Sequence, residues 1–161
     1  MHVVGHSGLL LAALVMAAPV AAKETRMTHH ATGQFEVTIT PEAQAAGDNG
    51  AMPTARMALL KTFSGPLTGT ARGTMLSAGT PGPGKAAAYV AVDQFAGTLE
   101  GKSGGFLLLH RGTMSSAGAE LSVMIAPDTG TGALAGISGT LSIEVKDGRH
   151  YYDLAYTLPT G

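Results

Sequence analysis

Residues 141–158, LSIEVKDGRHYYDLAYTL, decide the fold. Apolar and polar side chains alternate through the stretch, and the dipeptide Asp147-Gly148 at its centre favours a two-residue hairpin turn. With that turn, the facing pairs are Val145 and His150, Ile143 and Tyr152, and Leu141 and Leu154. The apolar side chains then share one face of the hairpin and the charged side chains the other, which supports this register.

The same alternation recurs in three earlier stretches, and glycine-rich turn signals separate them. No segment has a convincing helical period longer than one turn, so the pattern predicts an all-β chain of about eight strands. Closing such a sheet removes its edges, and eight strands suffice to hold side chains or one small ligand inside. We therefore expect an eight-stranded antiparallel barrel, with an open sandwich of the same strands as the alternative.

The first 22 residues have the features of a signal peptide. They carry no charged side chain, contain an apolar run from Gly8 to Ala18, and end in small residues, so we expect cleavage after Ala22. The alternative is an uncleaved anchor, although the apolar run falls short of the ~20 residues that span a membrane. We expect a flexible tail over residues 23–31, one barrel domain over 32–159, and a periplasmic or secreted protein with no stable membrane insertion after cleavage.

Composition excludes several functions. The 10 Lys and Arg residues against 11 Asp and Glu give a net charge of −1, which leaves no excess of basic residues for nucleic-acid binding. Absence of cysteine excludes disulfides, thiolate zinc sites, iron–sulfur clusters and a cysteine nucleophile. No cofactor motif is present, and His29-His30 is a weak copper signal in a stretch expected to be a plain tail. We expect neither a metal nor a cofactor.

Six segments carry a family resemblance: GQF at 33–35, KTFSG at 61–65, FAGTLEGKSG at 95–104, FLLLHRG at 106–112, GTGALAG at 130–136 and HYYDLAY at 150–156. With them the chain resembles, from about Thr32 to Leu158, the bacterial domain-of-unknown-function family 3224, whose fold is similar to the allene oxide cyclase and dirigent barrels. The resemblance implies a closed or nearly closed antiparallel barrel. It implies no reaction, because the family has no established activity. Family members usually have Glu at the position of Asp93.

The predicted hairpin around Gly101–Gly104 places a candidate catalytic pair. With Lys102-Ser103 as the hairpin loop, Phe95 faces His110, and Asp93 lies diagonal to His110 on the same face. If that face points inward, a carboxylate and an imidazole share an apolar interior and could transfer protons on a small apolar substrate. The alternative is a hydrogen-bonded core histidine with the aspartate at a solvated rim.

Five further inward-facing residues are candidates for ligand binding: Lys61, Tyr89, Phe95, His150 and Tyr152. Lys61 shares the parity of Leu59 and Phe63, and an inward lysine in an apolar cavity could bind an anionic ligand or act as a nucleophile. The alternative for this lysine is that its stem packs inside while its ammonium reaches the barrel mouth.

Three functions remain open. The first is a barrel that binds a small apolar molecule, which we favour. The second is a cofactor-free isomerase or cyclase that uses acid–base chemistry of Asp93 and His110, by analogy with allene oxide cyclase. The third is a structural, oligomeric barrel without a site. The apolar residues Val90, Val92, Leu107 and Leu109 lie opposite the inward set, so their exposure would indicate a homo-oligomer contact, whereas their burial would turn Asp93 and His110 outward.

Overall fold

The computed structural model describes residues 27–42 and 52–159. The predicted signal peptide and residues 23–26 of the predicted tail lie outside the described residues. Within the described ranges, no helix has the length and apolar character needed to cross a membrane.

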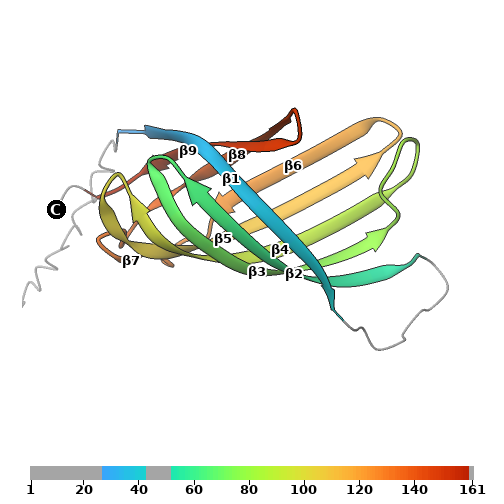
Figure 1. Cartoon of the computed structure of the whole chain (residues 1–161), viewed down its shortest axis with the longest axis horizontal. Helices are drawn as coiled ribbons and strands as arrows, with labels where there is room; N and C mark the ends of the chain where they lie inside the picture. The colour runs from blue at the N-terminus through green and yellow to red at the C-terminus, as the bar shows by residue number, and fades with distance from the viewer. Residues whose placement is uncertain (1–26, 43–51, 160–161) are drawn as a thin grey trace, which may run out of the picture.

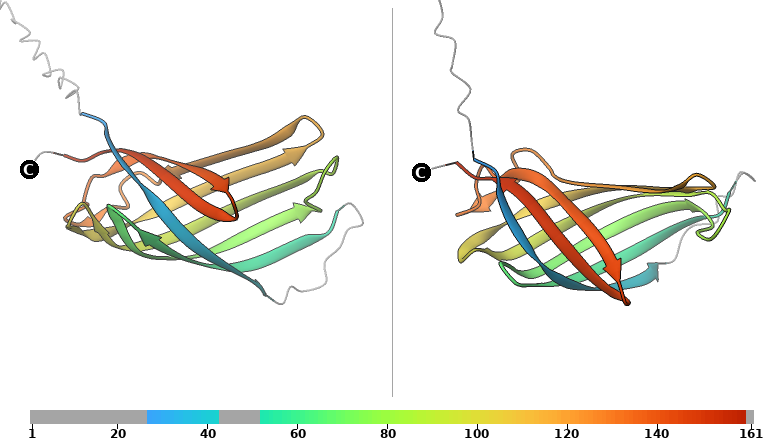
Figure 2. Two further views of the ribbon diagram at one scale, coloured as in Figure 1. Left: turned by 45° about the horizontal axis from the view of Figure 1, so that its top comes forward. Right: turned by 90° about the horizontal axis from the view of Figure 1, so that it is seen from above.

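The chain forms an antiparallel β-barrel, as predicted (Figure 1). Its strands are β1 (His29–Glu42), β2 (Thr54–Ser64), β3 (Leu67–Gly79), β4 (Ala87–Leu99), β5 (Lys102–Ser115), β6 (Gly118–Ile125), the two-residue β7 (Thr131–Gly132), β8 (Ser138–Lys146) and β9 (Arg149–Thr157). Sequential strands from β1 to β6 pair with one another, β8 follows β6, and β9 returns to β1, which closes eight strands. Figure 2 shows β1 beside β9, although the two strands come from opposite ends of the described chain.

The strands of the barrel are joined by ladders of very unequal length. Strands β4 and β5 pair along their whole length, from Ala87 opposite Met114 to Leu99 opposite Lys102. Between β6 and β8 only one pair of residues is joined in the ladder, Met124 opposite Thr140. We call this junction the β6–β8 seam. The barrel is therefore closed, but one junction is held by far fewer main-chain hydrogen bonds than the others.

The hairpin at Asp147-Gly148 forms in the predicted register, with Val145 opposite His150. Asp147 and Gly148 have φ angles of 52° and 74°, as a type I′ turn requires at both central positions. Strand β1 begins at His29, three residues before the expected start of the barrel, because residues 29–31 pair with the end of β9. This pairing shortens the predicted tail.

The predicted turn between β4 and β5 is wrong. The chain turns at Glu100-Gly101, with φ angles of 48° and 80°, rather than at Lys102-Ser103. A type I′ turn favours glycine at a central position, and Gly101 supplies it. His110 therefore faces Ala91 instead of Phe95. The register shifts by an even number of residues, so each side chain keeps its predicted face of the sheet.

The interior has a packed half and an open half. Around the turns at Gly65-Pro66 and Glu100-Gly101, at the left of Figure 1, aromatic and aliphatic side chains fill the barrel. Phe95 stacks on Phe106 with ring centroids 4.9 Å apart, and the rings of Phe63 and Phe95 form an edge-to-face pair with centroids 5.8 Å apart. Close packing of this kind makes the half a rigid base for the residues above it.

The outer face of the sheet confirms which way the site residues point. Val90, Val92 and Leu109 are exposed, Val90 by 55%, whereas Asp93 is fully buried and His110 is 7% exposed. The structure therefore excludes the alternative in which Asp93 and His110 face solvent.

Candidate functional site

The open half of the barrel contains a cavity of about 470 Å³. Every strand of the closed barrel contributes to its lining, and most of the lining side chains are apolar. The polar exceptions are Lys61, Ser77, Tyr89, His110 and His150. This size is within the range of small-molecule pockets, and the combination of apolar walls with a few polar groups is typical of them.

Three polar residues lie at the floor of this cavity, where it meets the packed half. On β4, Asp93 stands between the cavity-lining Ala91 and the packed Phe95. On β2, Lys61 stands in the same way between Leu59 and Phe63. His110 of β5 follows the packed Leu108 by two residues, and it lines the cavity. We call Lys61, Asp93 and His110 the floor cluster.

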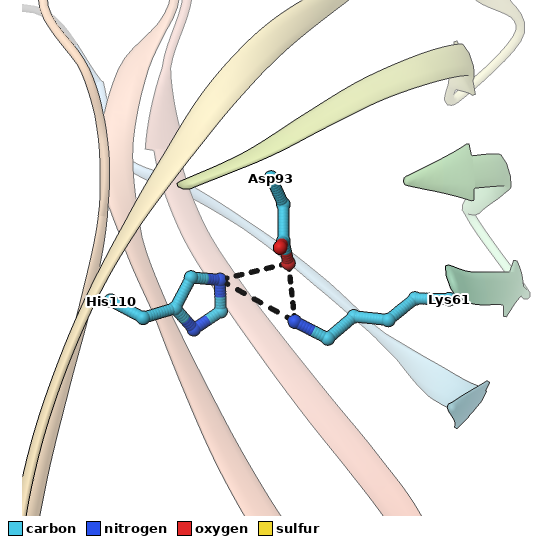
Figure 3. Close-up of polar contacts among 3 residues, drawn as sticks. All are labelled: Lys61, Asp93 and His110. Carbon is cyan, nitrogen blue, oxygen red and sulfur yellow. Dashed lines mark hydrogen bonds and ion pairs between the residues drawn. The ribbon is translucent and has the colours of Figure 1, made fainter. Parts of the chain in front are cut away.

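The floor cluster converges on one oxygen atom (Figure 3). Lys61 Nζ donates a hydrogen bond to Asp93 Oδ2, and His110 Nε2 lies 3.0 Å from that same oxygen. Lys61 Nζ is 3.5 Å from His110 Nε2. The predicted diagonal relation of Asp93 and His110 is therefore present, although in a different register, and Lys61 joins them from two strands away.

Small residues on the intervening strand β3 make this meeting possible. Ala71 lies opposite Lys61, and Gly73 lies opposite Asp93. A Cβ atom added at Gly73 would stand 2.1 Å from Asp93 Oδ1, closer than any real contact allows. The carboxylate therefore occupies the space that a side chain at position 73 would fill, and this lets it reach across β3 toward Lys61.

The surroundings of Asp93 keep it ionised. Burial alone would raise the pKa of its carboxyl, but the hydrogen bond from His110 and the charge of Lys61 outweigh burial and hold the pKa below its ordinary value. Asp93 Oδ1 is a buried side-chain atom with no hydrogen-bond partner among the described residues. The floor cluster is thus a buried ion pair with one acceptor left over.

Two of the other predicted ligand contacts also line the cavity. The ring of Tyr89 lies across Gly112, where an added Cβ would stand 2.0 Å from a ring carbon. Burial, and secondarily the charge of Asp93, raises the pKa of the Tyr89 hydroxyl. His150 packs on Phe35 with ring centroids 5.0 Å apart. Tyr89 and His150 thus add two polar side chains to the lining above the floor.

The remaining two predicted contacts lie elsewhere. Phe95 is within the packed half, between Phe63 and Phe106. The hydroxyl of Tyr152 accepts a hydrogen bond from the main-chain N–H of Leu67 at 3.1 Å and is 3.2 Å from the carbonyl oxygen of Ser64. Both residues point inward as predicted, but they sit below the floor cluster, so they support the barrel rather than line its cavity.

The sequence analysis missed the methionines of the cavity wall. Met57 and Met75 face each other across β2 and β3, and Met114 joins them in the lining. Their signal was the inward parity of Met57 with Leu59 and Lys61. Methionine is flexible and polarisable, so a wall of this kind adapts to varied apolar ligands.

No group of three or more metal-ligating side chains occurs in residues 27–42 and 52–159. The floor cluster offers one carboxylate and one imidazole, and its ammonium group is a hydrogen-bond donor rather than a ligand.

Comparison with known proteins places the chain in a family. No curated protein matches it. A crystal structure at 1.84 Å resolution of a protein with unknown function from Shewanella oneidensis MR-1, of the DUF3224 family, is 38% identical. The likeness covers 83% of this chain and 100% of that one, with a TM-score of 0.76. The family model described as "Protein of unknown function (DUF3224)" matches residues 31–156, and the chain therefore belongs to the DUF3224 family.

Proposed function

We propose that this protein binds a small, largely apolar molecule inside its barrel. The observation that carries the proposal is the apolar cavity of about 470 Å³ with the floor cluster at its base. An apolar ligand gains free energy by leaving water for such walls, and a few polar groups fix its orientation. We further propose that the protein is exported after cleavage of residues 1–22.

The rim of the cavity supports this proposal. Ile39 and Val145 line the cavity, yet they are 51% and 61% exposed. Leu121 of β6 lines it in the same way and is also exposed. An apolar rim around an apolar interior offers a continuous path from solvent for an apolar molecule.

The test is the binding of a neutral fluorescent probe, N-phenyl-1-naphthylamine, followed by displacement with candidate ligands. Met75 and Leu76 are neighbours on β3 that point to opposite faces, Met75 into the cavity and Leu76, 52% exposed, to solvent. We expect Met75→Trp to fill the cavity and weaken probe binding at least about tenfold, and the matched control Leu76→Trp to leave it unchanged. Equal affinity in both variants would place the probe outside the cavity and contradict the proposal.

We propose proton transfer on the bound molecule as a second candidate function. The contact of 3.0 Å between His110 Nε2 and Asp93 Oδ2 supports it, because a carboxylate that holds one ring nitrogen orients the other as a base. His110 would take a proton from a carbon beside a carbonyl group and return it to another carbon, which isomerises the substrate without a cofactor. The resemblance to allene oxide cyclase barrels supports a cofactor-free isomerase by fold analogy alone.

The measurement for this second function is incorporation of solvent deuterium into enolisable ketones, read by mass spectrometry. We expect incorporation above the buffer rate with the natural chain, and a return to the buffer rate with His110→Gln. Absence of incorporation with the natural chain, for ketones that displace the probe, would leave binding as the function and remove the isomerase.

A further inference from the structure

Lys61 has more hydrogen-bond donors than the floor cluster uses. Its ammonium carries three N–H groups, and its contacts are Asp93 Oδ2 and, at 3.5 Å, His110 Nε2. The residue is 7% exposed and lines the cavity. At least one N–H group of Lys61 is therefore free to meet an acceptor brought by a ligand.

The geometry also fixes the proton on His110. A nitrogen 3.0 Å from a carboxylate oxygen must carry a hydrogen, since two lone pairs would repel each other at that distance. We therefore assign a ring proton to Nε2, which also explains why the approach of Lys61 Nζ to Nε2 is long. In the form of the ring with one proton, Nδ1 carries the lone pair, and in Figure 3 it points away from Asp93. Nδ1 makes no hydrogen bond to any described residue, and it is not completely shielded from solvent.

The floor cluster can compensate one further negative charge only if a proton is taken up together with it. Asp93 and Lys61 compensate each other, and β6 brings Val123 rather than a charged side chain against His110. Tyr89 and His150 are the other titratable groups in the cavity lining. A ligand carboxylate adds one negative charge in a poorly hydrated place, and protonation of His110 at Nδ1 restores neutrality.

We propose that the cavity binds an amphiphile with a carboxylate head group and an apolar body, such as a fatty acid. The carboxylate accepts a hydrogen bond from Lys61 and one from protonated His110 Nδ1, and the apolar body lies along the methionine wall. One proton is taken up with each ligand. A dianionic head group does not fit, because one imidazole balances one charge. This inference rests on the proposed function, since it names the class of molecule that the cavity holds.

The test compares dodecanoate with 1-dodecanol, which share a chain and differ in the head group, by displacement of N-phenyl-1-naphthylamine from the natural chain. We expect dodecanoate to bind at least about tenfold more tightly at pH 7, and Lys61→Met to reduce that ratio to about one while 1-dodecanol still binds. The matched control is Lys102→Met at the start of β5, at the packed end of the barrel, where the lysine is exposed and the ratio is expected to stay as in the natural chain.

A second measurement needs no variant. Calorimetry of dodecanoate binding at pH 8, in two buffers of different ionisation enthalpy, reports the protons taken up. We expect about one proton per dodecanoate and none per 1-dodecanol. Equal affinity for the two ligands, or no proton uptake with dodecanoate, overturns the carboxylate proposal while the proposed function stands. If neither ligand nor the neutral probe binds, the proposed function falls, and this inference falls with it.

Discussion

The buried ion pair of Lys61 and Asp93 should respond to mutation in a way that an exposed pair cannot. The side chain of Lys61 is 8% exposed and that of Asp93 is fully buried, so water screens the pair very little. Removing one partner leaves the other charge without compensation, which costs about 3–5 kcal/mol in the free energy of unfolding. We therefore expect Lys61→Met and Asp93→Asn each to destabilise the barrel by that amount.

The double variant Lys61→Met/Asp93→Asn removes both charges and keeps an acceptor for His110. We expect its loss in the free energy of unfolding to be about 2 kcal/mol smaller than the sum of the two single losses, because no uncompensated charge remains. A matched control is available at the surface, where Arg56 and Glu42 form an ion pair of 2.7 Å with side chains 52% and 39% exposed. Arg56→Met is expected to cost less than about 1 kcal/mol.

The assay is urea unfolding at pH 7 followed by circular dichroism, with thermal unfolding as a second readout. At about 2–4 °C per kcal/mol for a chain of this size, the single variants should lower Tm by roughly 6–20 °C. Single losses as small as that of Arg56→Met, or a double variant equal to the sum of the singles, would refute the account of Lys61 and Asp93 as a tightly coupled buried pair.

Three further predictions concern stability. Tyr152→Phe leaves the buried N–H of Leu67 without its partner and is expected to cost about 1–3 kcal/mol in urea unfolding, whereas Tyr151→Phe on the opposite face is expected to cost under 0.5 kcal/mol, roughly the limit for surface changes; equal effects would contradict the role given to the Tyr152 hydroxyl. Gly73→Ala brings a Cβ against both Asp93 Oδ1 and the main-chain carbonyl oxygen of Val92 and is expected to cost about 1–3 kcal/mol, and an unchanged urea midpoint would show that the carboxylate does not need that space. Because the pKa of Asp93 is lowered in the folded state, its ionised carboxylate stabilises the fold fully above about pH 4, and this stabilisation is lost as pH falls through the folded-state pKa. The natural chain is therefore expected to lose more stability below pH 4 than Asp93→Asn does. Parallel profiles of stability against pH for the two proteins would show that Asp93 is not the cause.

The alternation of apolar and polar residues was enough to predict the barrel and to place Asp93 and His110 on the same face of the sheet. A period of two shows which residues share a face, but it left open whether that face points inward, and the burial of Asp93 and His110 decided it. The turn at Asp147-Gly148 was predictable because the dipeptide is unambiguous and the flanking residues agree with it.

The register of the β4–β5 hairpin was not predictable in the same way. Residues 101–104 contain glycine at both ends, so more than one turn position satisfies the local chemistry, and an even shift leaves the faces unchanged. The contact between Lys61 on β2 and Asp93 on β4 spans the strand β3 between them. A local sequence pattern does not indicate that side chains from two such strands meet. Its only trace in the sequence is the pair of small inward residues, Ala71 and Gly73, on the strand between them.

The division of the interior into two halves was also beyond the sequence. Alternation shows that Phe95 and Tyr89 share one face of the sheet, but it does not say which end of a strand meets densely packed neighbours. That outcome depends on the strand tilt and on where each turn falls along the barrel axis. Phe95 and Tyr152 consequently belong to the packed half, although they share the inward parity of the residues that line the cavity.

Because of the β6–β8 seam, local opening of the barrel is expected to be easier between these two strands than between any other pair of neighbouring barrel strands. With one register pair, Met124 opposite Thr140, the seam has the fewest main-chain hydrogen bonds to break, so local opening there has the lowest free-energy cost. Amide hydrogens along the facing edges of β6 and β8 are then expected to exchange with solvent fastest among the barrel strands. An opening of this kind would let a bound molecule leave sideways, between two strands, at a rate that does not depend on the global stability of the barrel.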